Sequence, residues 1–342
     1  MSAADWGRAY LAGEGVRGRA FADAVLTPAE AAYRAWMALR RRAYEAGAAS
    51  PRRPALPVLS VGNLVVGGAG KTPVAAFLAS RLADRGARPA IVHGGYAPDE
   101  PLLHRAWNPH VPVLVGRDRH DAVRRAAAAG ADVAVLDDGF QHLRMWRDLD
   151  LVLVPVERWR TRPRLLPRGP WREPPAALRS ADLVGLTHRG ADPRRVADVR
   201  AAVAALTTAP VAEFVLETVG WRRLAPPRPE GAAAGAAREA VPAGPALGVC
   251  AIADPEGFRR SAERAGADIA TLLTYGDHHA YDASDLDRIV HGAAGRPILT
   301  TEKDAVKLAP LAGRAPVWVL AERVRLAAGA DEIGRALGRL IA

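Results

Sequence analysis

The sequence predicts an α/β fold built around a parallel sheet with helices on both of its faces. Short apolar runs typical of buried strands alternate along the chain with longer helical segments. Residues 58–73, VLSVGNLVVGGAGKTP, pass from one such strand through a glycine-rich turn into the start of a helix. A second strand-like run, VAVL, ends in the adjacent aspartates Asp137 and Asp138. The length of 342 residues suggests two domains rather than one.

Residues 65–72 form a predicted phosphate-binding loop, so the first domain is expected to be P-loop NTPase-like. Glycines let backbone N–H groups approach phosphate oxygens, and a helix N-terminus adds donors and a positive dipole end. Lys71 can reach the β- and γ-phosphates of a nucleotide, and the Thr72 hydroxyl can bind Mg²⁺. The predicted nucleotide-binding residues are Val65, Val66, Gly67, Gly68, Ala69, Gly70, Lys71 and Thr72.

The alternative for this stretch is a glycine-rich turn that happens to contain a lysine. The general pattern has a glycine five residues before Gly70, where this chain has Val65. We favour the phosphate loop because Gly-Lys-Thr follows a strand and opens a helix, which is the context that the motif requires.

The segment before the loop predicts a basic amphipathic helix over residues 28–46. Thr27 can cap this helix, Pro28 suits its first position, and Glu30 completes a capping box. The arginines and apolar side chains of the helix would suit an anionic membrane surface. A helix packed on its own domain with solvated arginines fits the same pattern and is the more common case.

Between the loop and residue 208, strands and helices alternate as a covered parallel sheet requires. The expected strands are 58–61, 89–92, 111–115, 132–136, 149–155 and 181–186. The expected helices are 74–85, 121–129 and 193–206, with loops over 93–101 and 158–179. Residues 211–218 and 221–224 alternate like a hairpin or an extended linker, and the Ala/Gly/Pro-rich residues 226–245 predict a flexible surface excursion.

A second strand–helix series follows residue 245 and predicts a further α/β domain. Its expected strands are 246–252, 269–274, 297–300 and 317–320. Its expected helices are 257–265, 284–291, 301–308 and 331–341.

The composition limits which binding partners and which cellular compartment we expect. The net charge of +10 favours anionic partners, but the basic residues are scattered without aromatic clusters, which argues against nucleic acid. Cys250 is the only cysteine, so no internal disulfide can form, and we expect a small buried residue in a reducing compartment. We see no run of about 18 apolar residues and no signal-peptide pattern, and therefore expect a cytosolic protein.

Asp137 and Asp138 have the form of a Walker B element, in which a carboxylate at the C-terminal end of a parallel strand holds Mg²⁺ beside the phosphate loop. A pair of loop or capping aspartates is the alternative, and the nearby phosphate loop favours the metal role. Asp277 beside His278 could polarise an imidazole for proton transfer or bind a metal. This pair is a weak signal alone, as is Asp99 in the loop after the second strand.

Taken together, six segments resemble the tetraacyldisaccharide 4′-kinase family, the lipid A 4′-kinases. In chain order they are VGNLVVGGAGKTP, PDEP, DDGFQH followed by RD, LLPRGPWREP, GDHHAY and TTEKDAVKL. They extend from about residue 55 to residue 310, and DDGFQH and TEKDAVK are far more specific than a nucleotide-binding loop. The family's own loop has the same glycine spacing, which accounts for Val65.

The resemblance implies a kinase that uses ATP and Mg²⁺ to phosphorylate the 4′-hydroxyl of a tetraacyldisaccharide 1-phosphate. This step of lipid A synthesis, which forms lipid IVA, takes place at the cytoplasmic face of the inner membrane, so the enzyme would bind an anionic membrane surface peripherally. The resemblance also implies two α/β domains joined by a two-stranded linker. We expect a P-loop domain over residues 1–208, linker strands and a loop over 209–245, and a smaller domain over 246–342, in a monomer.

The same resemblance implies a role for each matching residue. Asp99 would act as base on the sugar hydroxyl, assisted by His278 with Asp277 beside it. Lys71 would act on the phosphates, and the Mg²⁺ ligands would be Thr72, Asp137 and Asp138. The residues expected to line the substrate site are Gln141, His142, Arg172 and Glu173.

The chain departs from the family's pattern after the second strand. The family usually has Ser-Arg-Gly-Tyr-Gly-Gly there, whereas residues 93–98 read HGGYAP, without the arginine and with a shorter path to Asp99. An altered acceptor site would favour a P-loop kinase of another glycolipid or sugar. A nucleotide-dependent regulatory protein without transfer activity is a further alternative, and it would need no base at Asp99 or His278.

Overall fold

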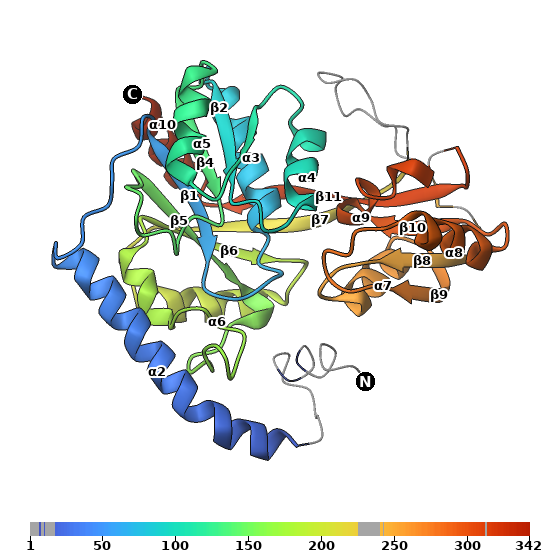
Figure 1. Cartoon of the computed structure of the whole chain (residues 1–342), viewed down its shortest axis with the longest axis horizontal. Helices are drawn as coiled ribbons and strands as arrows, with labels where there is room; N and C mark the ends of the chain where they lie inside the picture. Colours follow the sequence, from blue (N-terminus) through green and yellow to red (C-terminus); the bar gives the residue numbers. More distant parts are fainter. Residues whose placement is uncertain (1–6, 8–9, 11–17, 225–239, 242, 312) are drawn as a thin grey trace. The chain divides into compact units, whose positions relative to one another are not determined.

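The computed structural model of the chain describes residues 7, 10, 18–224, 240–241, 243–311 and 313–342 (Figure 1). These residues form an α/β protein with parallel strands, as predicted. They fall into two compact units. Unit 1 comprises Met1–Lys71, Asp138–Phe214 and Leu326–Ala342, and unit 2 comprises Thr72–Asp137 and Val215–Arg325. Within the part of the chain that is described, no helix has the length and apolar character needed to cross a membrane.

Unit 1 is built on three parallel strands that lie side by side. They are β1 (Val58–Asn63), β5 (Leu149–Pro155) and β6 (Leu183–His188), with Leu59 opposite Leu149 and Leu151 opposite Leu183. Every residue of the three strands is buried, which explains their mostly apolar sequences. The helical elements of this unit are α2 (Arg19–Glu45), η1 (Val156–Arg158), η2 (Pro175–Ser180), α6 (Pro193–Ala204) and α10 (Ala330–Ile341).

Unit 2 contains two groups of parallel strands. The first group has the order β3 (Val113–Val115), β2 (Pro89–His93), β4 (Val133–Asp137), and its helices are α3 (Lys71–Ala83), α4 (Asp99–Trp107) and α5 (Arg119–Ala128). The second has the order β11 (Val317–Ala328), β10 (Ile298–Thr301), β8 (Pro245–Cys250), β9 (Asp268–Thr274). Its helical elements are α7 (Pro255–Arg264), α8 (Ala283–Ala293), α9 (Glu302–Ala305) and η3 (Ala309–Leu311). The Trp107 indole of α4 donates to Glu302 of α9 at 3.3 Å and so connects the two groups.

The predicted two-stranded linker corresponds to β7 (Val211–Arg223) and β11. These strands are neighbours in the sheet order, and each contains residues of both units. Glu217 of β7 forms an ion pair with Arg323 of β11 at 3.0 Å. Residues 211–223 are one continuous strand rather than a hairpin, and β11 extends well beyond the predicted 317–320. The domain limits at residues 208 and 245 stay a prediction, and most of the segment 226–245 lies outside the described residues.

The predicted start of the N-terminal helix is wrong. α2 begins at Arg19, after Gly18 with φ 77°, and Pro28 lies inside the helix. Pro28 lacks the N–H that would donate to the Ala24 carbonyl, and in the same turn the Thr27 hydroxyl donates to the Asp23 carbonyl at 2.5 Å. Glu30 does not cap, because it is buried and accepts a hydrogen bond from the Leu165 N–H at 2.9 Å. Contacts with a distant segment therefore outweigh the local capping pattern.

The stretch predicted as a loop over residues 93–101 contains the start of α4. Asp99 is the first residue of this helix, and Glu100 follows it in the first turn. Both carboxylates are favourable at the positive end of the helix dipole. Pro101 is tolerated in the same turn because first-turn N–H groups have no partner within the helix. The sequence Asp-Glu-Pro is thus a helix start.

Gly62 of β1 lies directly against Phe140. A Cβ at residue 62 would overlap the Phe140 Cβ and lie 2.8 Å from its backbone nitrogen. We expect Gly62→Ala to lower the free energy of unfolding by about 1–3 kcal/mol, because the backbone must shift to relieve the overlap. Denaturant unfolding followed by circular dichroism measures this change.

The matched control is Gly338→Ala on α10, where a Cβ would have nothing within 4 Å. That variant should be neutral or more stable by up to about 1 kcal/mol, because alanine favours helix. Equal unfolding midpoints for the two variants would contradict the close packing of Gly62 on Phe140.

Candidate active site

The predicted phosphate loop connects β1 to α3. Gly67, Gly68 and Gly70 have φ values of 65°, 62° and 76°, a region that favours glycine. Side chains from the rest of unit 1 bind the loop carbonyls. The Thr187 hydroxyl donates to Ala69 O at 3.0 Å, and the Arg158 guanidinium donates to Gly67 O at 2.6 Å. The loop is therefore held from outside by side chains of β6 and η1.

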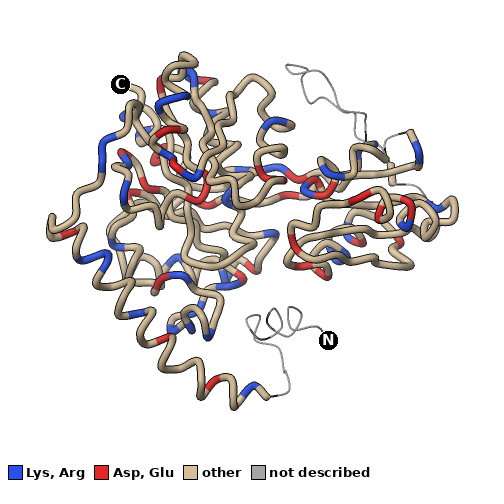
Figure 2. Tube along the Cα trace, in the orientation of Figure 1, with Lys and Arg blue, Asp and Glu red and all other residues tan. Residues whose placement is uncertain are grey.

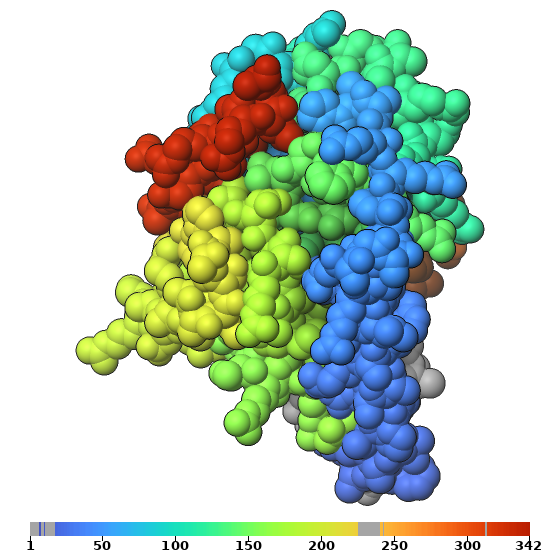
Figure 3. All heavy atoms as spheres, turned by 90° about the vertical axis from the view of Figure 1, so that its left-hand side faces the viewer, coloured from blue at the N-terminus to red at the C-terminus, as the bar shows by residue number. Residues whose placement is uncertain are grey.

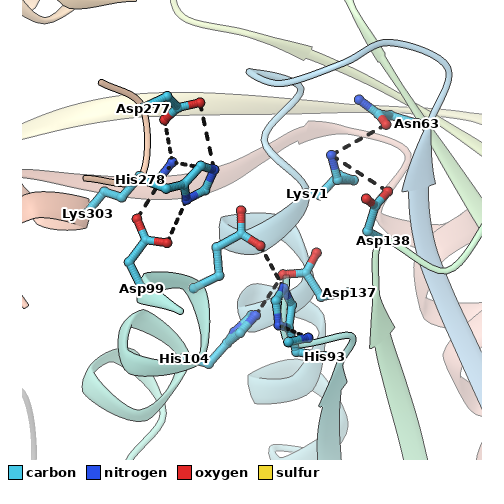
Figure 4. Close-up of polar contacts among 12 residues, drawn as sticks. Asn63, Lys71, His93, Asp99, His104, Asp137, Asp138, Asp277, His278 and Lys303 are labelled. Carbon is cyan, nitrogen blue, oxygen red and sulfur yellow. Dashed lines mark hydrogen bonds and ion pairs between the residues drawn. The ribbon is translucent and has the colours of Figure 1, made fainter. Parts of the chain in front are cut away.

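Lys71 and Asp138 face each other in unit 1, as Figure 4 shows. The Lys71 ammonium lies 3.8 Å from Asp138 Oδ1 and 3.5 Å from Asn63 Oδ1. Arg172 Nη1 donates to both Asp138 oxygens at 2.8 Å. Asp138 also has φ 60°, which is uncommon for a residue other than glycine. The predicted phosphate-binding lysine, one predicted metal ligand and one predicted substrate residue thus form a single cluster.

Gln141 and Glu173 extend this cluster. The Gln141 amide donates to Asn63 O at 2.9 Å and to Glu173 Oε1 at 3.1 Å. Glu173 is buried, and the Arg41 guanidinium of α2 compensates its charge at 2.6 Å. His142 is half-buried next to Gln141, and its carbonyl accepts a hydrogen bond from Arg147 at 3.0 Å. The four predicted substrate residues therefore all lie in unit 1, where hydrogen bonds of Gln141 join Arg172 and Glu173.

Unit 2 brings Asp99 and His278 together from positions far apart in the sequence. Asp99 opens α4, and His278 lies in the loop after β9 with φ 61°. Their Oδ1 and Nδ1 atoms are 2.7 Å apart, and the Asp99 side chain is fully buried. Asp277 Oδ2 lies 3.7 Å from His278 Nε2. The two residues predicted to form the catalytic base, Asp99 and His278, are thus in contact within one unit (Figure 4).

The surroundings of this pair shift the pKa of both members. Burial raises the pKa of the Asp99 carboxyl, but the His278 hydrogen bond and the charges of Lys303 and Lys307 outweigh it, so the net pKa is lowered. The hydrogen bond to Asp99 raises the pKa of His278, and burial and Lys303 oppose this rise without cancelling it. The pair therefore keeps Asp99 ionised and increases the basicity of the imidazole.

Asp137, the other predicted metal ligand, is buried at the end of β4. The His104 ring of α4 lies beside it, with Nε2 2.9 Å from Asp137 Oδ2. Asp137 and Asp138 are adjacent in the sequence but have different partners. Asp137 contacts His104 in unit 2, and Asp138 contacts Arg172 in unit 1.

Three residues of unit 2, His93, Glu100 and Asp137, each place a possible ligand atom within 4.8 Å of the others. His93 Nδ1 accepts a hydrogen bond from the Gly95 N–H at 3.0 Å, so its proton is on Nε2, which lies 2.8 Å from Glu100. His93 therefore orients Glu100 rather than offering a free nitrogen. The carboxylates of Glu100 and Asp137, and the buried Thr72 hydroxyl of α3, are the oxygen donors that Mg²⁺ prefers.

Sequence reasoning missed several residues of these clusters. The predicted loop over 93–101 hid the start of α4, and with it the helical spacing of Glu100 and His104 from Asp99. His93 was noticed only as a departure from the family's pattern. Lys303 and Lys307 stand in a motif that was predicted as a helix start, and nothing local indicates that they face Asp99.

The fold and these clusters define a class of protein. A parallel α/β unit with a strand, a glycine loop and a Lys-Thr helix start is typical of nucleoside-triphosphate-binding proteins. The Asp–His pair adds a group that can accept a proton from a hydroxyl, which is a requirement of a kinase.

Comparison with known proteins identifies the particular family. The family model described as "Tetraacyldisaccharide-1-P 4'-kinase" matches residues 22–98 and 97–341, so the chain belongs to the tetraacyldisaccharide 4′-kinase family. A protein named tetraacyldisaccharide 4′-kinase from Anaeromyxobacter dehalogenans (strain 2CP-C) is 40% identical over 352 residues, covering 93% of this chain and 90% of the relative. The protein of that name from Syntrophus aciditrophicus (strain SB) is 38% identical, covering 82% of each chain.

A solved structure is also similar. The crystal structure of the "apo" form of LpxK from Aquifex aeolicus in complex with ATP has a TM-score of 0.73 and 26% sequence identity. The match covers 93% of this chain and 99% of that chain. This likeness confirms the predicted fold class over nearly the whole length.

The hydrogen bond to Asp99 predicts the titration of His278. We expect the His278 pKa to lie above the ordinary value of about 6.5 and to fall in Asp99→Asn, because the amide cannot stabilise the imidazolium as a carboxylate does. Histidine carbon–proton NMR measures both values, with the His278 signal assigned from its loss in His278→Gln. A wild-type pKa at or below 6.5, or no fall in Asp99→Asn, would contradict the pairing.

Proposed function

We propose that the chain transfers the γ-phosphate of ATP to the 4′-hydroxyl of tetraacyldisaccharide 1-phosphate, a step of lipid A biosynthesis. Membership of the kinase family over most of the chain supports this reaction. The observation that carries the proposal in the structure is the 2.7 Å hydrogen bond between the buried Asp99 and the half-buried His278. Transfer to a hydroxyl needs a base, whereas a nucleotide-dependent regulatory protein does not.

The phosphate side of the reaction is assigned to the loop of unit 1. Residues 65–72 would bind the phosphates through backbone N–H groups, and Lys71 would leave Asp138 to meet the β- and γ-phosphates. Thr72, Asp137 and Asp138 would hold Mg²⁺, and the acidic cluster around Asp137 has the oxygen donors for it. Mg²⁺ supplies neutralisation of the phosphate charge that develops during transfer.

The acceptor side is assigned to Asp99 and His278. The sugar hydroxyl oxygen attacks the γ-phosphorus, the bond from phosphorus to the β-phosphate oxygen breaks, and ADP leaves with the electron pair. The hydroxyl proton passes to Asp99, whose lowered pKa keeps it ionised beforehand, and His278 assists. Asp277 beside the ring helps to hold the imidazole. Phosphoryl transfer depends mainly on position and charge, which suits a pair that is held by a hydrogen bond and by nearby charges.

The residues that would line the substrate site all belong to unit 1: Gln141, His142, Arg172 and Glu173. Hydrogen bonds of Gln141 join Arg172 and Glu173, and the His142 carbonyl accepts from Arg147. Arg172 carries the charge and the planar donor set that suit a phosphate group. Because Asp138 holds Arg172 at 2.8 Å, an anion that displaced this contact would free Asp138 at the same time.

Helix α2 supports the proposal that the enzyme works at an anionic membrane surface. Figure 3 shows α2 (blue) as a ridge on the surface of the molecule, and Figure 2 shows basic residues along it. Its Phe21 and Leu39 side chains are 76% and 69% exposed, and Trp36 is 56% exposed. Arg41 meanwhile binds Glu173 of unit 1. One side of α2 thus packs on its own unit, and another offers apolar and basic groups to a bilayer surface. We place this surface at the cytoplasmic face of the inner membrane and expect a monomer.

The direct test is transfer of label from γ-labelled ATP to tetraacyldisaccharide 1-phosphate in detergent micelles with Mg²⁺. We expect wild type to label the lipid, and Lys71→Ala and Asp99→Ala to lose the activity by about 100-fold or more, because each removes a group that acts in the transition state. Label that appears only on another glycolipid would move the proposal to that acceptor. ATP hydrolysis without transfer to any acceptor would support the regulatory alternative.

The membrane role of α2 is tested by sedimentation with vesicles of phosphatidylglycerol. The double variant Trp36→Ser and Leu39→Ser should bind at least about tenfold more weakly, because burial of each apolar side chain contributes about 1.5–3 kcal/mol. High salt should weaken the binding of wild type, because the arginines contribute electrostatically. Val115→Ser, which changes a 38% exposed side chain of unit 2, is the control. Equal binding of all three proteins would rule out this surface of α2.

A further inference from the structure

Lysine is rare in this chain, and each lysine lies in one of two short motifs, GKT or TEKDAVK. Lys and Arg together number 47, and only three of them are lysines, Lys71, Lys303 and Lys307. Lys71 belongs to the phosphate loop. The other two stand in the motif TEKDAVK, to which the mechanism above assigns no role. In a chain that uses arginine almost everywhere for positive charge, these positions indicate a need for a compact ammonium group rather than a planar guanidinium.

The short helix α9 and the residues after it hold the two lysines in place. Thr301 caps the helix, with its hydroxyl accepting from the Asp304 N–H at 3.1 Å. Asp304 is buried and accepts from the Ala251 N–H and the Tyr281 hydroxyl, both at 3.1 Å. Lys303 and Lys307 are four residues apart, so this geometry presents them on one side, next to Asp99.

Lys307 is the inner of the two lysines. Its side chain is only 9% exposed, and its ammonium lies 3.7 Å from Asp99 Oδ2 and 3.1 Å from Asp304 Oδ1. The same nitrogen lies 5.3 Å from the centroid of the Tyr281 ring, a cation–π distance. Asp99 Oδ2 accepts no hydrogen bond from the described residues, so the nearby lysine charges are what compensate this oxygen.

Lys303 contacts the other member of the pair. Its ammonium lies 3.0 Å from Asp277 Oδ1, 3.2 Å from His278 Nε2 and 3.7 Å from Asp99 Oδ2, as the dashed lines of Figure 4 show. An ammonium group can only donate, so a hydrogen bond to Nε2 requires the lone pair on that atom. The ring proton of neutral His278 then lies on Nδ1, where it is donated to Asp99 Oδ1.

We propose that Lys303 and Lys307 are positioning residues for phosphoryl transfer. They hold the Asp99 carboxylate at its Oδ2 atom, and Lys303 fixes His278 in the tautomer with its proton on Nδ1. The proposal rests on the proposed kinase function. A base that must accept a proton from a hydroxyl needs one defined orientation and one defined hydrogen-bond pattern. Without the lysines, the carboxylate can rotate about its bond, and the imidazole proton can move to Nε2.

The size of the ammonium explains the choice of lysine. Lys303 fits among three acceptor groups, on Asp277, His278 and Asp99, at 3.0–3.7 Å. The longer planar guanidinium of arginine would displace the ring or the carboxylate. Arginine at either position should therefore fail to replace lysine, even though the charge is kept.

The kinetic test uses the full chain with saturating lipid acceptor and varied ATP. We expect Lys303→Met and Lys307→Met each to lower kcat by about 100-fold with little change of KM for ATP, the loss typical of a misplaced catalytic group. Lys303→Arg and Lys307→Arg should recover little of the rate. Arg314→Met, which removes an exposed ion pair with Asp287 in the same unit, is the matched control and should keep full activity.

The structural test reads the tautomer of His278 directly by ¹⁵N NMR of the wild-type chain at a pH above the His278 pKa. We expect a protonated Nδ1 and an unprotonated Nε2 in wild type, and a mixture of tautomers in Lys303→Met. Full kcat in both methionine variants, or a proton on Nε2 in wild type, would overturn the proposal. The NMR result stands even if a variant is unstable, and a wild type that labels no lipid would count against the kinase function instead.

Discussion

The structure depends on placing a cation or a hydrogen-bonding partner beside the carboxylates that the fold buries. An ionised carboxylate in a protein interior is strongly destabilising unless it is paired and hydrogen-bonded. Three buried carboxylates have such a cation, in the pairs Glu30–Arg168, Glu173–Arg41 and Asp304–Lys307, and Asp137 has the His104 ring 2.9 Å away. Asp99 has His278 and the two lysines of the TEKDAVK motif. Glu30, Glu173 and Asp99 have partners that are distant in the sequence, so satisfying these charges also fixes α2 and α4 within their units.

The same constraint accounts for the chemistry of each unit. In unit 1, Lys71 and Arg172 both face Asp138, so a cationic pair is held ready where the predicted phosphate loop ends. In unit 2, the cations around Asp99 keep it ionised although it is buried. A base in that position must be desolvated to be strong, yet must not pick up a proton from solvent beforehand. Compensation by nearby cations, rather than by water, meets both conditions.

The parts of the fold that the sequence predicted are those that depend on local patterns. The strands of unit 1 are fully buried, so their apolar runs are unambiguous, and the phosphate loop has its own glycine and lysine pattern. The start of α2 was wrong because Gly18 and the buried Glu30, rather than Thr27 and Pro28, determine it. The Asp99–His278 contact joins residues 179 positions apart, which no local pattern contains. Only the family resemblance indicated it, and that resemblance said nothing about the lysines.

The stretch between β2 and Asp99 departs from the family's pattern, and its structure shows how the start of α4 is positioned. His93, the last residue of β2, is buried, accepts a hydrogen bond from the Gly95 N–H, and lies 2.8 Å from Glu100. The histidine therefore closes a tight turn and fixes the first turn of α4, of which Asp99 is the first residue. A longer loop would have to be ordered by other contacts, whereas here one side chain does this directly. The departure from the family's pattern at His93 thus supplies a contact that fixes the helix turn to which Asp99 belongs.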